Sequence, residues 1–261
     1  QSVERSFSLV EPYVKALIAE IRTGGEMARN SHLRPRAFYM GGGTPTTLTA
    51  DQMDAVLTAL EESFDLSACP ELTVEAGRPD TITAEKLAVL KSHGVTRVSV
   101  NPQTMEDKVL AAIGRRHTAA ETEQAMELVR AYHFRDVNMD LIAGLPEDTP
   151  AGFRRSLDKC LEMGASNITV HTLALKKGSR ILTECLSIPD GAAVQAMLDY
   201  AAPTLRAAGF APYYLYRQKY MSGSFENVGW CRPGGECWYN VDIMSELCSI
   251  LSFGAGGPRK W

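Results

Sequence analysis

The sequence has no long apolar run and no charged-then-apolar pattern at its N-terminus. Because roughly 18 apolar residues are needed to span a bilayer, we expect neither a membrane anchor nor a signal peptide, and therefore a cytoplasmic location. The sequence also lacks blocks of like charge: the net charge is −4, and the basic residues are scattered along 261 residues. This pattern argues against nucleic-acid binding and favours a small-molecule partner.

Cysteine is sparse and irregularly spaced. Several cysteines fall within apolar helical patterns, where the side chain usually behaves as a small core residue, so we expect reduced thiols. Cys231 and Cys237 form the closest pair, but the five residues between them exceed the usual metal-ligand spacing of about two to four. We therefore expect a surface loop there and no metal site in this chain. The six cysteines are Cys69, Cys160, Cys185, Cys231, Cys237 and Cys248.

Short β-rich runs alternate with amphipathic helical patterns. Helix starts are marked by capping boxes at Thr49 and Thr118, and helix ends by Gly94, Gly164 and Gly209. This alternation predicts right-handed crossovers, a parallel sheet and an α/β fold. Since a single α/β barrel commonly needs about 250 residues, we expect one domain over residues 1–261. The runs are residues 37–40, 72–75, 97–100, 137–142, 167–173 and 213–216.

An amphipathic helical pattern around Val14, Leu17 and Ile21 comes before the first of these runs. A series of alternating strands and helices normally begins with a strand, so we expect a missing segment upstream of Gln1. The turn-like residues Gly254 to Gly257 indicate in the same way that the chain leads onward. We accordingly expect the domain to be incomplete at its N-terminus and to stop early at its C-terminus.

Unusual residues follow the predicted strands, at the ends where reactive groups collect in parallel α/β folds. The first run ends in Gly41 to Thr46, whose three glycines either expose backbone to an approaching ligand or form a plain strand-to-helix turn. Glu75 interrupts an apolar strand end, and it either meets a ligand or pairs with Arg78 or another local arginine. Asp140 either binds a ligand or caps a turn. His171 is either a site residue or a satisfied core histidine.

Taken together, several of these segments resemble the SAM-binding signatures of the radical S-adenosylmethionine (SAM) enzymes of the oxygen-independent coproporphyrinogen III dehydrogenase family. The segments are Gly41 to Thr46, Val74 to Asp80, Ser99 to Gln103, Gly114 to Thr118 and Asn138 to Pro146. The resemblance to the HemZ-type branch in particular is carried by Val170 to Ala174, Pro212 to Lys219 and Glu226 to Gly229.

The resemblance implies a role for residues at the methionine end of SAM. Gly42, Gly43, Thr44 and Glu75 would receive the methionine part, with the acidic group facing the ammonium. Arg115 would pair with the methionine carboxylate, for which a guanidinium fork is the geometric match.

The same resemblance implies an adenosine site. Gln103 and Asp140 would bind the ribose hydroxyls, and Ala174 would line the adenine pocket. These residue types suit the task, because a diol needs acceptors such as carboxylate or amide oxygens.

The family comparison also implies a fold, cofactors and partners. The fold would be a partial (β/α)6 TIM-like barrel of the radical SAM type, lacking its first strand and cluster loop in this chain. The cofactors would be SAM and a [4Fe-4S] cluster. The family holds this cluster with Cys-x-x-x-Cys-x-x-Cys, a spacing that does not occur here, so we expect the cluster cysteines upstream of Gln1. We expect this fragment alone to be inactive.

The implied reaction is the oxidative decarboxylation of coproporphyrinogen III propionates to vinyl groups, giving protoporphyrinogen IX. The partners would be the porphyrinogen substrate and an electron donor protein. Two alternatives stay open at this point: a haem-binding chaperone or carrier on the same fold, and a metal-independent barrel enzyme that never had a cluster.

Overall fold

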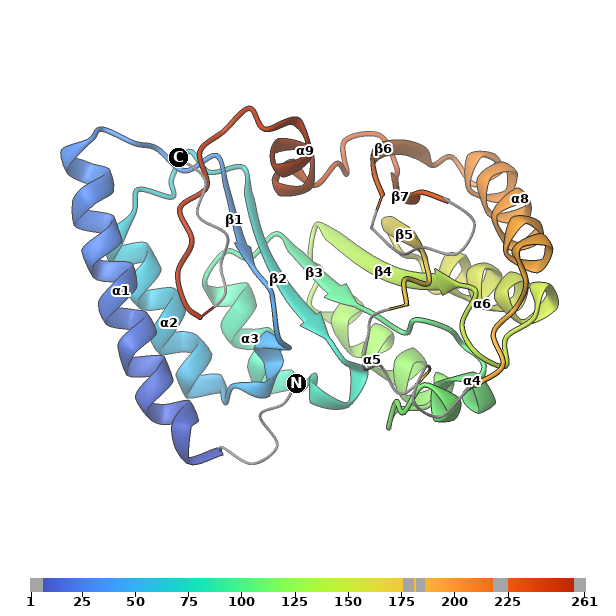
Figure 1. The fold of residues 1–261 in the computed structure, drawn as a ribbon. Helices are drawn as coiled ribbons and strands as arrows, with labels where there is room; N and C mark the ends of the chain where they lie inside the picture. Colours follow the sequence, from blue (N-terminus) through green and yellow to red (C-terminus); the bar gives the residue numbers. More distant parts are fainter. Residues whose placement is uncertain (1–6, 176–180, 182–185, 218–224, 256–261) are drawn as a thin grey trace. The chain divides into compact units, whose positions relative to one another are not determined.

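In the computed structural model, the described residues are 7–175, 181, 186–217 and 225–255 (Figure 1). The chain divides into two compact units. Unit 1 comprises residues 1–77, 81–98 and 237–261, and unit 2 comprises residues 78–80 and 99–236. The expected single domain over residues 1–261 stays a prediction.

Unit 1 is built from parallel strands with helices beside them. β1 runs parallel to β2, with Ala37 opposite Glu71 and Met40 opposite Val74. The expected α/β alternation is therefore confirmed here. Its elements are η1 (Phe7–Leu9), α1 (Val10–Asn30), β1 (Ala37–Met40), η2 (Pro45–Thr47), α2 (Ala50–Ser63), β2 (Glu71–Gly77), α3 (Ala84–Ser92) and α9 (Trp238–Ser245); η3 (Pro79–Thr81) and β3 (Arg97–Val100) cross its boundary.

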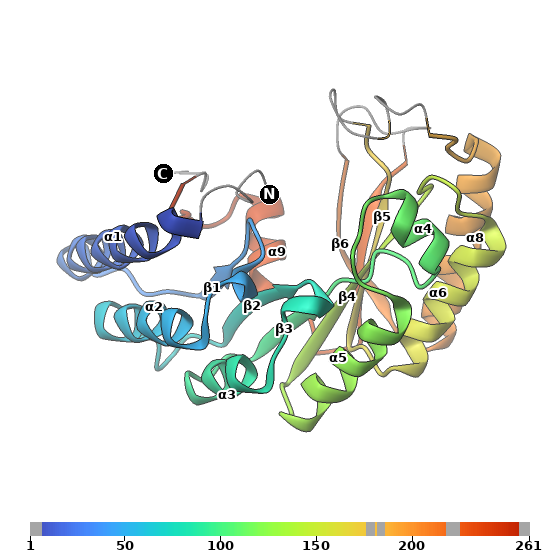
Figure 2. The same ribbon diagram turned by 90° about the horizontal axis from the view of Figure 1, so that it is seen from below.

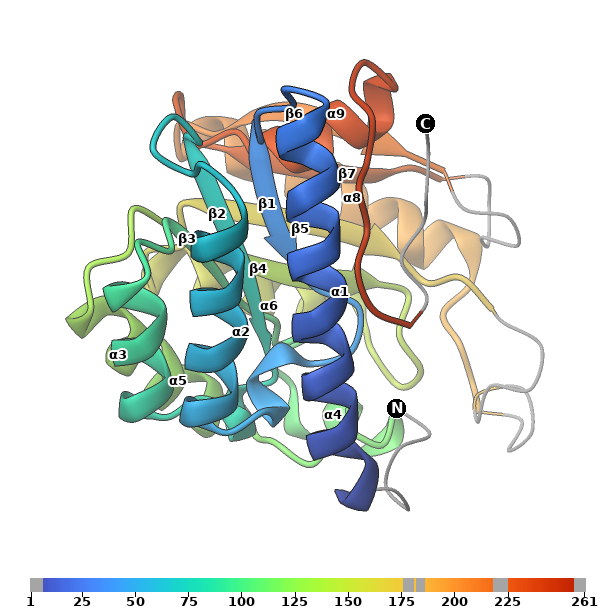
Figure 3. The same ribbon diagram turned by 90° about the vertical axis from the view of Figure 1, so that its left-hand side faces the viewer.

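α1 and α2 form where the periodicity predicted helices, whereas α9 was not predicted. The predicted capping box of α2 is present. The Thr49 hydroxyl accepts a hydrogen bond from the Gln52 N–H, and the Gln52 side-chain oxygen accepts one from the Thr49 N–H. The buried face of α2 includes Met53, Val56 and Leu57. Figure 3 shows α1 and α2 packed side by side, and α9 lies beside β1.

The N-terminus of α9 rests on a buried carboxylate. Glu71 accepts hydrogen bonds from the backbone N–H groups of Trp238 and Tyr239, at 2.8 and 3.2 Å, and from the Cys237 thiol at 3.2 Å. The Arg97 guanidinium lies 3.7 Å from the same carboxylate, and neither side chain is more than 2% exposed. The negative charge of the Glu71 carboxylate thus balances both the positive N-terminal end of the α9 dipole and the charge of the Arg97 guanidinium.

Unit 2 contains a mixed sheet. β4 and β5 are parallel, from Asn138 opposite Asn167 to Ala143 opposite Thr172. β7 runs antiparallel to both β5 and β6. The expectation of a parallel sheet is therefore wrong for β6 and β7. The elements are α4 (Asp107–Ala112), α5 (Ala119–Ala131), β4 (Asp136–Ala143), α6 (Pro150–Glu162), β5 (Asn167–Thr172), α8 (Gly191–Ala207), β6 (Ala211–Tyr216) and β7 (Asn227–Cys231).

The sequence analysis did not predict β7 as a strand. Few residues of β7 have β-branched side chains and one is Gly229, so the local sequence pattern for a strand is weak. The expected surface loop is present between Cys231 and Cys237, where Arg232, Pro233 and Gly234 are exposed, but the two cysteines that flank it are buried. Cys231 ends β7 at 1% exposure, and Cys237 caps α9 at 2% exposure. Both thiols are core side chains.

The two faces of the unit 2 sheet differ in character. On β4, Met139, Leu141 and Ala143 are fully buried, whereas Asn138 and Asp140 are half-buried. Because side chains alternate along a strand, these two sets point to opposite faces. Figure 2 shows α5, α6 and α8 gathered on one side of β4 and β5. The other side of the sheet carries the polar residues.

Within the described residues, every helix is too short or too polar to span a membrane.

Candidate functional site

In unit 1, the glycine run after β1 presents open backbone. Gly42 has a φ of +95°, and a Cβ added to Gly42 or Gly43 would meet nothing within 4 Å. At Gly41, by contrast, a Cβ would lie 3.0 Å from the Glu75 carboxyl carbon. Thr44 then leads into η2. The backbone of this loop therefore passes directly beside Glu75 and can approach a ligand closely.

Glu75 lies near the end of β2 and accepts a hydrogen bond from the Tyr39 hydroxyl. The Tyr39 ring stacks on Tyr239 of α9, with centroids 4.2 Å apart and planes 18° apart. Burial raises the pKa of Tyr239, and the negative charge of Glu75 raises it further. Unit 1 thus holds a fixed carboxylate beside an accessible glycine backbone, and the oxygen atoms of both can accept hydrogen bonds from an ammonium group.

In unit 2, arginines outnumber acids around Arg115. Arg115 follows α4, is half-buried, and has its pKa lowered by burial and by the nearby Arg78 charge, with Asp80 opposing them. The Asp80 carboxylate already accepts two hydrogen bonds from Arg78, from Nε at 3.0 Å and from Nη2 at 2.5 Å. The surplus of positive charge suits a carboxylate ligand, as predicted for Arg115.

His117, which lies between Arg115 and the N-cap residue Thr118, is buried at 2% exposure. Its Nε2 lies 3.4 Å from the Pro102 carbonyl oxygen. Burial lowers the pKa of His117, and the Arg115 charge adds to this effect. The contact holds the loop that carries Arg115 against the loop that leads to Gln103.

The structure brings Gln103 and Asp140 together. The Gln103 N–H donates to the Asp140 carbonyl at 3.0 Å, and the Ile142 N–H donates to the Gln103 carbonyl at 3.0 Å. Gln103 has a φ of +71°, which is uncommon for a residue other than glycine and often marks a functional position. Gln103 and Asp140, which are predicted to bind the same ribose, are therefore joined by a backbone hydrogen bond.

Asp140 lies within β4, so it does not cap a turn. Its Oδ1 accepts a hydrogen bond from the Asn138 amide at 2.8 Å and lies 3.7 Å from His171 Nε2. Burial by itself raises the pKa of Asp140, but the contacts with His171 and then Asn138 and Thr169 outweigh it, so the pKa lies below its usual value. The carboxylate is ionised and can accept from hydroxyl groups.

Ala174 lies two residues after the end of β5 and is half-buried. The adjacent Leu173 N–H donates to the Ala143 carbonyl at 3.0 Å, which ties this segment to the end of β4. A small apolar side chain here is compatible with the predicted adenine pocket. In the segment Pro212 to Lys219, Gln218 and Lys219 lie outside the described residues, as does Cys185.

The described cysteines do not provide a cluster site. Burial raises the pKa of Cys237 to about 12 and also raises the pKa of Cys160, so both thiols are protonated at neutral pH. Across the described ranges, no group of three His, Cys, Asp or Glu side chains is arranged to hold a metal ion. These residues therefore do not fit an iron–sulfur cluster, whereas the Gln103, Arg115 and Asp140 region and the Glu75 region each have donors that fit part of SAM.

Asp148 is a titratable group that the sequence analysis missed. It precedes the N-cap of α6 and is 7% exposed. Burial raises its pKa to about 6, although a 2.8 Å hydrogen bond from the Thr149 N–H partly opposes the shift. The charge of Glu106, which is distant in the chain, raises the pKa further. Because burial and Glu106 both act through the tertiary structure, the local sequence carries no signal for this shift.

We predict that Asp148 makes stability depend on pH in the acid range. The folded state binds its proton more tightly than the unfolded chain, so stability should fall as pH rises from 3.8 to about 6. Asp148→Asn should stabilise the protein at pH 7 by about 1–2 kcal/mol, after allowance for solvent screening, and flatten this slope. Denaturant titrations at pH 4 and pH 7 measure both effects. Asp199→Asn, on the exposed face of α8, is the control, and an unchanged slope in Asp148→Asn would contradict the assignment.

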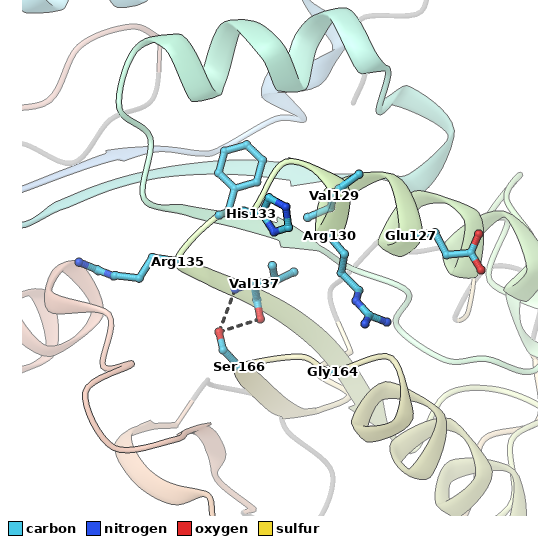
Figure 4. A pocket seen from close by; sticks show the side chains of 10 residues that line it. Glu127, Val129, Arg130, His133, Arg135, Val137, Gly164 and Ser166 are labelled. Atoms are coloured by element: carbon cyan, nitrogen blue, oxygen red, sulfur yellow. Dashed lines mark hydrogen bonds between the residues drawn. The ribbon is translucent and has the colours of Figure 1, made fainter.

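A cavity of about 550 Å³ lies elsewhere in unit 2 and is lined by residues that include Glu127, Arg130, His133 and Ser166 (Figure 4). The Ser166 hydroxyl accepts from the Val137 N–H at 2.8 Å and donates to its carbonyl at 3.3 Å. The cavity is therefore at the beginning of β4, opposite the strand end near Gly144. Residues at this end of parallel strands serve stability rather than catalysis.

The sequence is similar to known proteins along most of its length. The model of the radical SAM superfamily matches residues 13–160. The chain is 40% identical over 255 residues to the oxygen-independent coproporphyrinogen-III oxidase-like protein HemZ of Bacillus subtilis, covering 97% of the chain and 51% of that protein. It is 31% identical over 207 residues to the heme chaperone HemW of Mycobacterium tuberculosis, covering 78% of the chain and 50% of that protein. The chain spans about half the length of these curated relatives.

A solved structure has the same fold. Coproporphyrinogen III oxidase (HemN) from Escherichia coli, described as a radical SAM enzyme, superposes with a TM-score of 0.75 at 21% sequence identity. The match covers 94% of this chain and 53% of that chain. The predicted radical SAM fold class is thereby confirmed.

Proposed function

Because the chain belongs to the radical SAM superfamily, we propose that it is part of an oxidoreductase of haem biosynthesis that acts on coproporphyrinogen III. The reaction would be the oxidative decarboxylation of propionate side chains to vinyl groups, which gives protoporphyrinogen IX. The 40% identity to the HemZ protein supports this reaction over others in the superfamily. The observation that carries the proposal is the backbone pairing of Gln103 with Asp140, two acceptors suited to one ribose.

In this proposal the residues of the chain bind and orient SAM. Asp140 and Gln103 accept from the ribose hydroxyls, Arg115 pairs with the carboxylate, and Glu75 pairs with the ammonium. Gly42, Gly43 and Thr44 offer backbone to the methionine, and Ala174 lines the adenine pocket. The [4Fe-4S] cluster and SAM, when bound, supply the radical chemistry, while the protein supplies orientation. The proposed partners are the porphyrinogen and an electron donor protein, and the proposed location is the cytoplasm.

A second candidate is a haem chaperone, which the 31% identity to the HemW protein supports. The two candidates differ in the ligand that the chain retains. An oxidoreductase binds SAM to react with a porphyrinogen, whereas a carrier holds haem itself.

A ligand-binding experiment on this chain tests the proposal. We expect calorimetric titration to give stoichiometric binding of 5′-deoxyadenosine and SAM, and we expect haem titration to give no stoichiometric absorbance change. Asp140→Asn should weaken the adenosine ligands. Stoichiometric haem binding with no adenosine binding would replace the oxidoreductase with the chaperone. Absence of both would contradict the SAM site itself.

A further inference from the structure

A chain of polar contacts crosses the helix-free face of the unit 2 sheet. The Tyr216 hydroxyl lies 3.2 Å from His171 Nδ1, and the two rings meet edge to face with centroids 6.3 Å apart. The other ring nitrogen, Nε2, lies 3.7 Å from Asp140 Oδ1. If the phenol donates to Nδ1, the ring carries a proton on Nε2, which faces the carboxylate, because a ring nitrogen that accepts a hydrogen bond leaves the proton to the other nitrogen.

A glycine makes this arrangement possible, because β7 lies between β5 and β6. Gly229 pairs with Thr169 on one side and Tyr214 on the other. A Cβ at Gly229 would come within 1.8 Å of the Tyr214 ring. Tyr214 in turn stacks on Tyr216, with planes 6° apart. With no side chain in the way, the tyrosines of β6 reach over β7 toward β5.

His171 does not fit the alternative of a satisfied core histidine. Its side chain is 23% exposed, and that of Asp140 is 22% exposed, so both lie at an accessible surface. Both ring nitrogens of His171 face side chains of other strands. The contacts of Asn138 and His171 both fall on Oδ1 of Asp140, and Thr169 also bonds the carboxylate, so several strands hold this group.

We propose that His171 and Tyr216 are positioning residues that hold the Asp140 carboxylate in place for the hydroxyls of a ribose. Tyr216 selects the Nε2–H form of His171, and the positive edge of that N–H group then faces the Asp140 carboxylate at an N···O distance of 3.7 Å. Gly229 provides the space for the Tyr214 ring, on which Tyr216 stacks. The identity of the ligand as an adenosine compound rests on the proposed function, but the link among the three side chains does not.

Matched ligands separate a positioning role from a merely structural one. In this chain, His171→Leu should weaken adenosine binding about tenfold and Tyr216→Phe about threefold, because an acceptor is misplaced rather than removed. Neither change should alter binding of 2′,3′-dideoxyadenosine, which lacks the diol. His171→Gln, whose amide can still donate toward Asp140, should recover part of the loss. Tyr200→Phe on α8, whose hydroxyl bonds Asp158 outside this network, is the control.

Nitrogen NMR of the His171 ring gives the independent readout. The wild-type chain should show a protonated Nε2 and an unprotonated Nδ1, and Tyr216→Phe should shift the population toward the other form. Equal losses for both ligands, or an Nδ1–H form in the wild type, would overturn the proposal. If the wild type did not bind adenosine, or if Asp140→Asn left adenosine affinity unchanged, the proposed SAM site would be contradicted instead. The NMR result would still decide the role of His171.

Discussion

Glu71→Ala should lower the free energy of unfolding by about 3–5 kcal/mol, the usual cost of removing one partner of a buried ion pair. The change leaves the Arg97 guanidinium buried without its carboxylate and removes the acceptor of two backbone N–H groups at the start of α9. Denaturant titration followed by circular dichroism measures this loss. Protease sensitivity near Trp238 should rise as well, since the same carboxylate anchors α9.

An exposed pair provides the comparison for Glu71. Glu62 pairs with Arg22 at 3.2 Å, and both side chains are more than half exposed. Glu62→Ala should change stability by about 1 kcal/mol or less, because solvent screens surface pairs. If both variants lost the same small amount, the carboxylate of Glu71 would not be the anchor of α9.

Arg115→Ala and Glu75→Gln should each weaken SAM binding by about 1.5–3 kcal/mol, the range for hydrogen bonds to charged groups. Each variant removes the charge that would face one end of the methionine zwitterion. Asp140→Asn should weaken SAM and 5′-deoxyadenosine but leave free methionine nearly unchanged, because the ribose is absent from methionine. Calorimetry with the three ligands separates these contributions.

The neighbouring Arg116 supplies a matched control for Arg115. It is exposed, whereas Arg115 is half-buried, so Arg116→Ala should change SAM affinity little. Unchanged SAM affinity in all three site variants would mean that these residues serve only the local structure. In that case the roles implied by the family resemblance would not hold in this chain.

Local signals in the sequence were sufficient for most helices and strands. The capping boxes at Thr49 and Thr118 are both formed as predicted. Gly94, Gly164 and Gly209 all have positive φ, as expected after helices. These features depend on bonds between residues a few positions apart, so a single sequence contains all the information they need.

The candidate site could be predicted only as a set of residues. Glycines and isolated polar groups at strand ends pointed to Gly42, Glu75 and Asp140, because such residues are costly in apolar strands unless they have partners. The partners themselves could not be predicted. Tyr39, which bonds Glu75, and Tyr216, which bonds His171, come from strands whose placement is set by tertiary pairing.

The sequence by itself determined the alternation of elements, the helix ends and the polar residues that follow the strands, since these depend on periodicity and short-range bonds. Only the tertiary structure decided that β7 enters antiparallel between β5 and β6, that Glu71 anchors a helix 167 residues further along, and that Gly229 leaves room for the Tyr214 ring beside Tyr216. Each of these joins residues distant in the chain. Their energies depend on burial and exact distance, which arise only when the packed sheet and helices fix both partners in space.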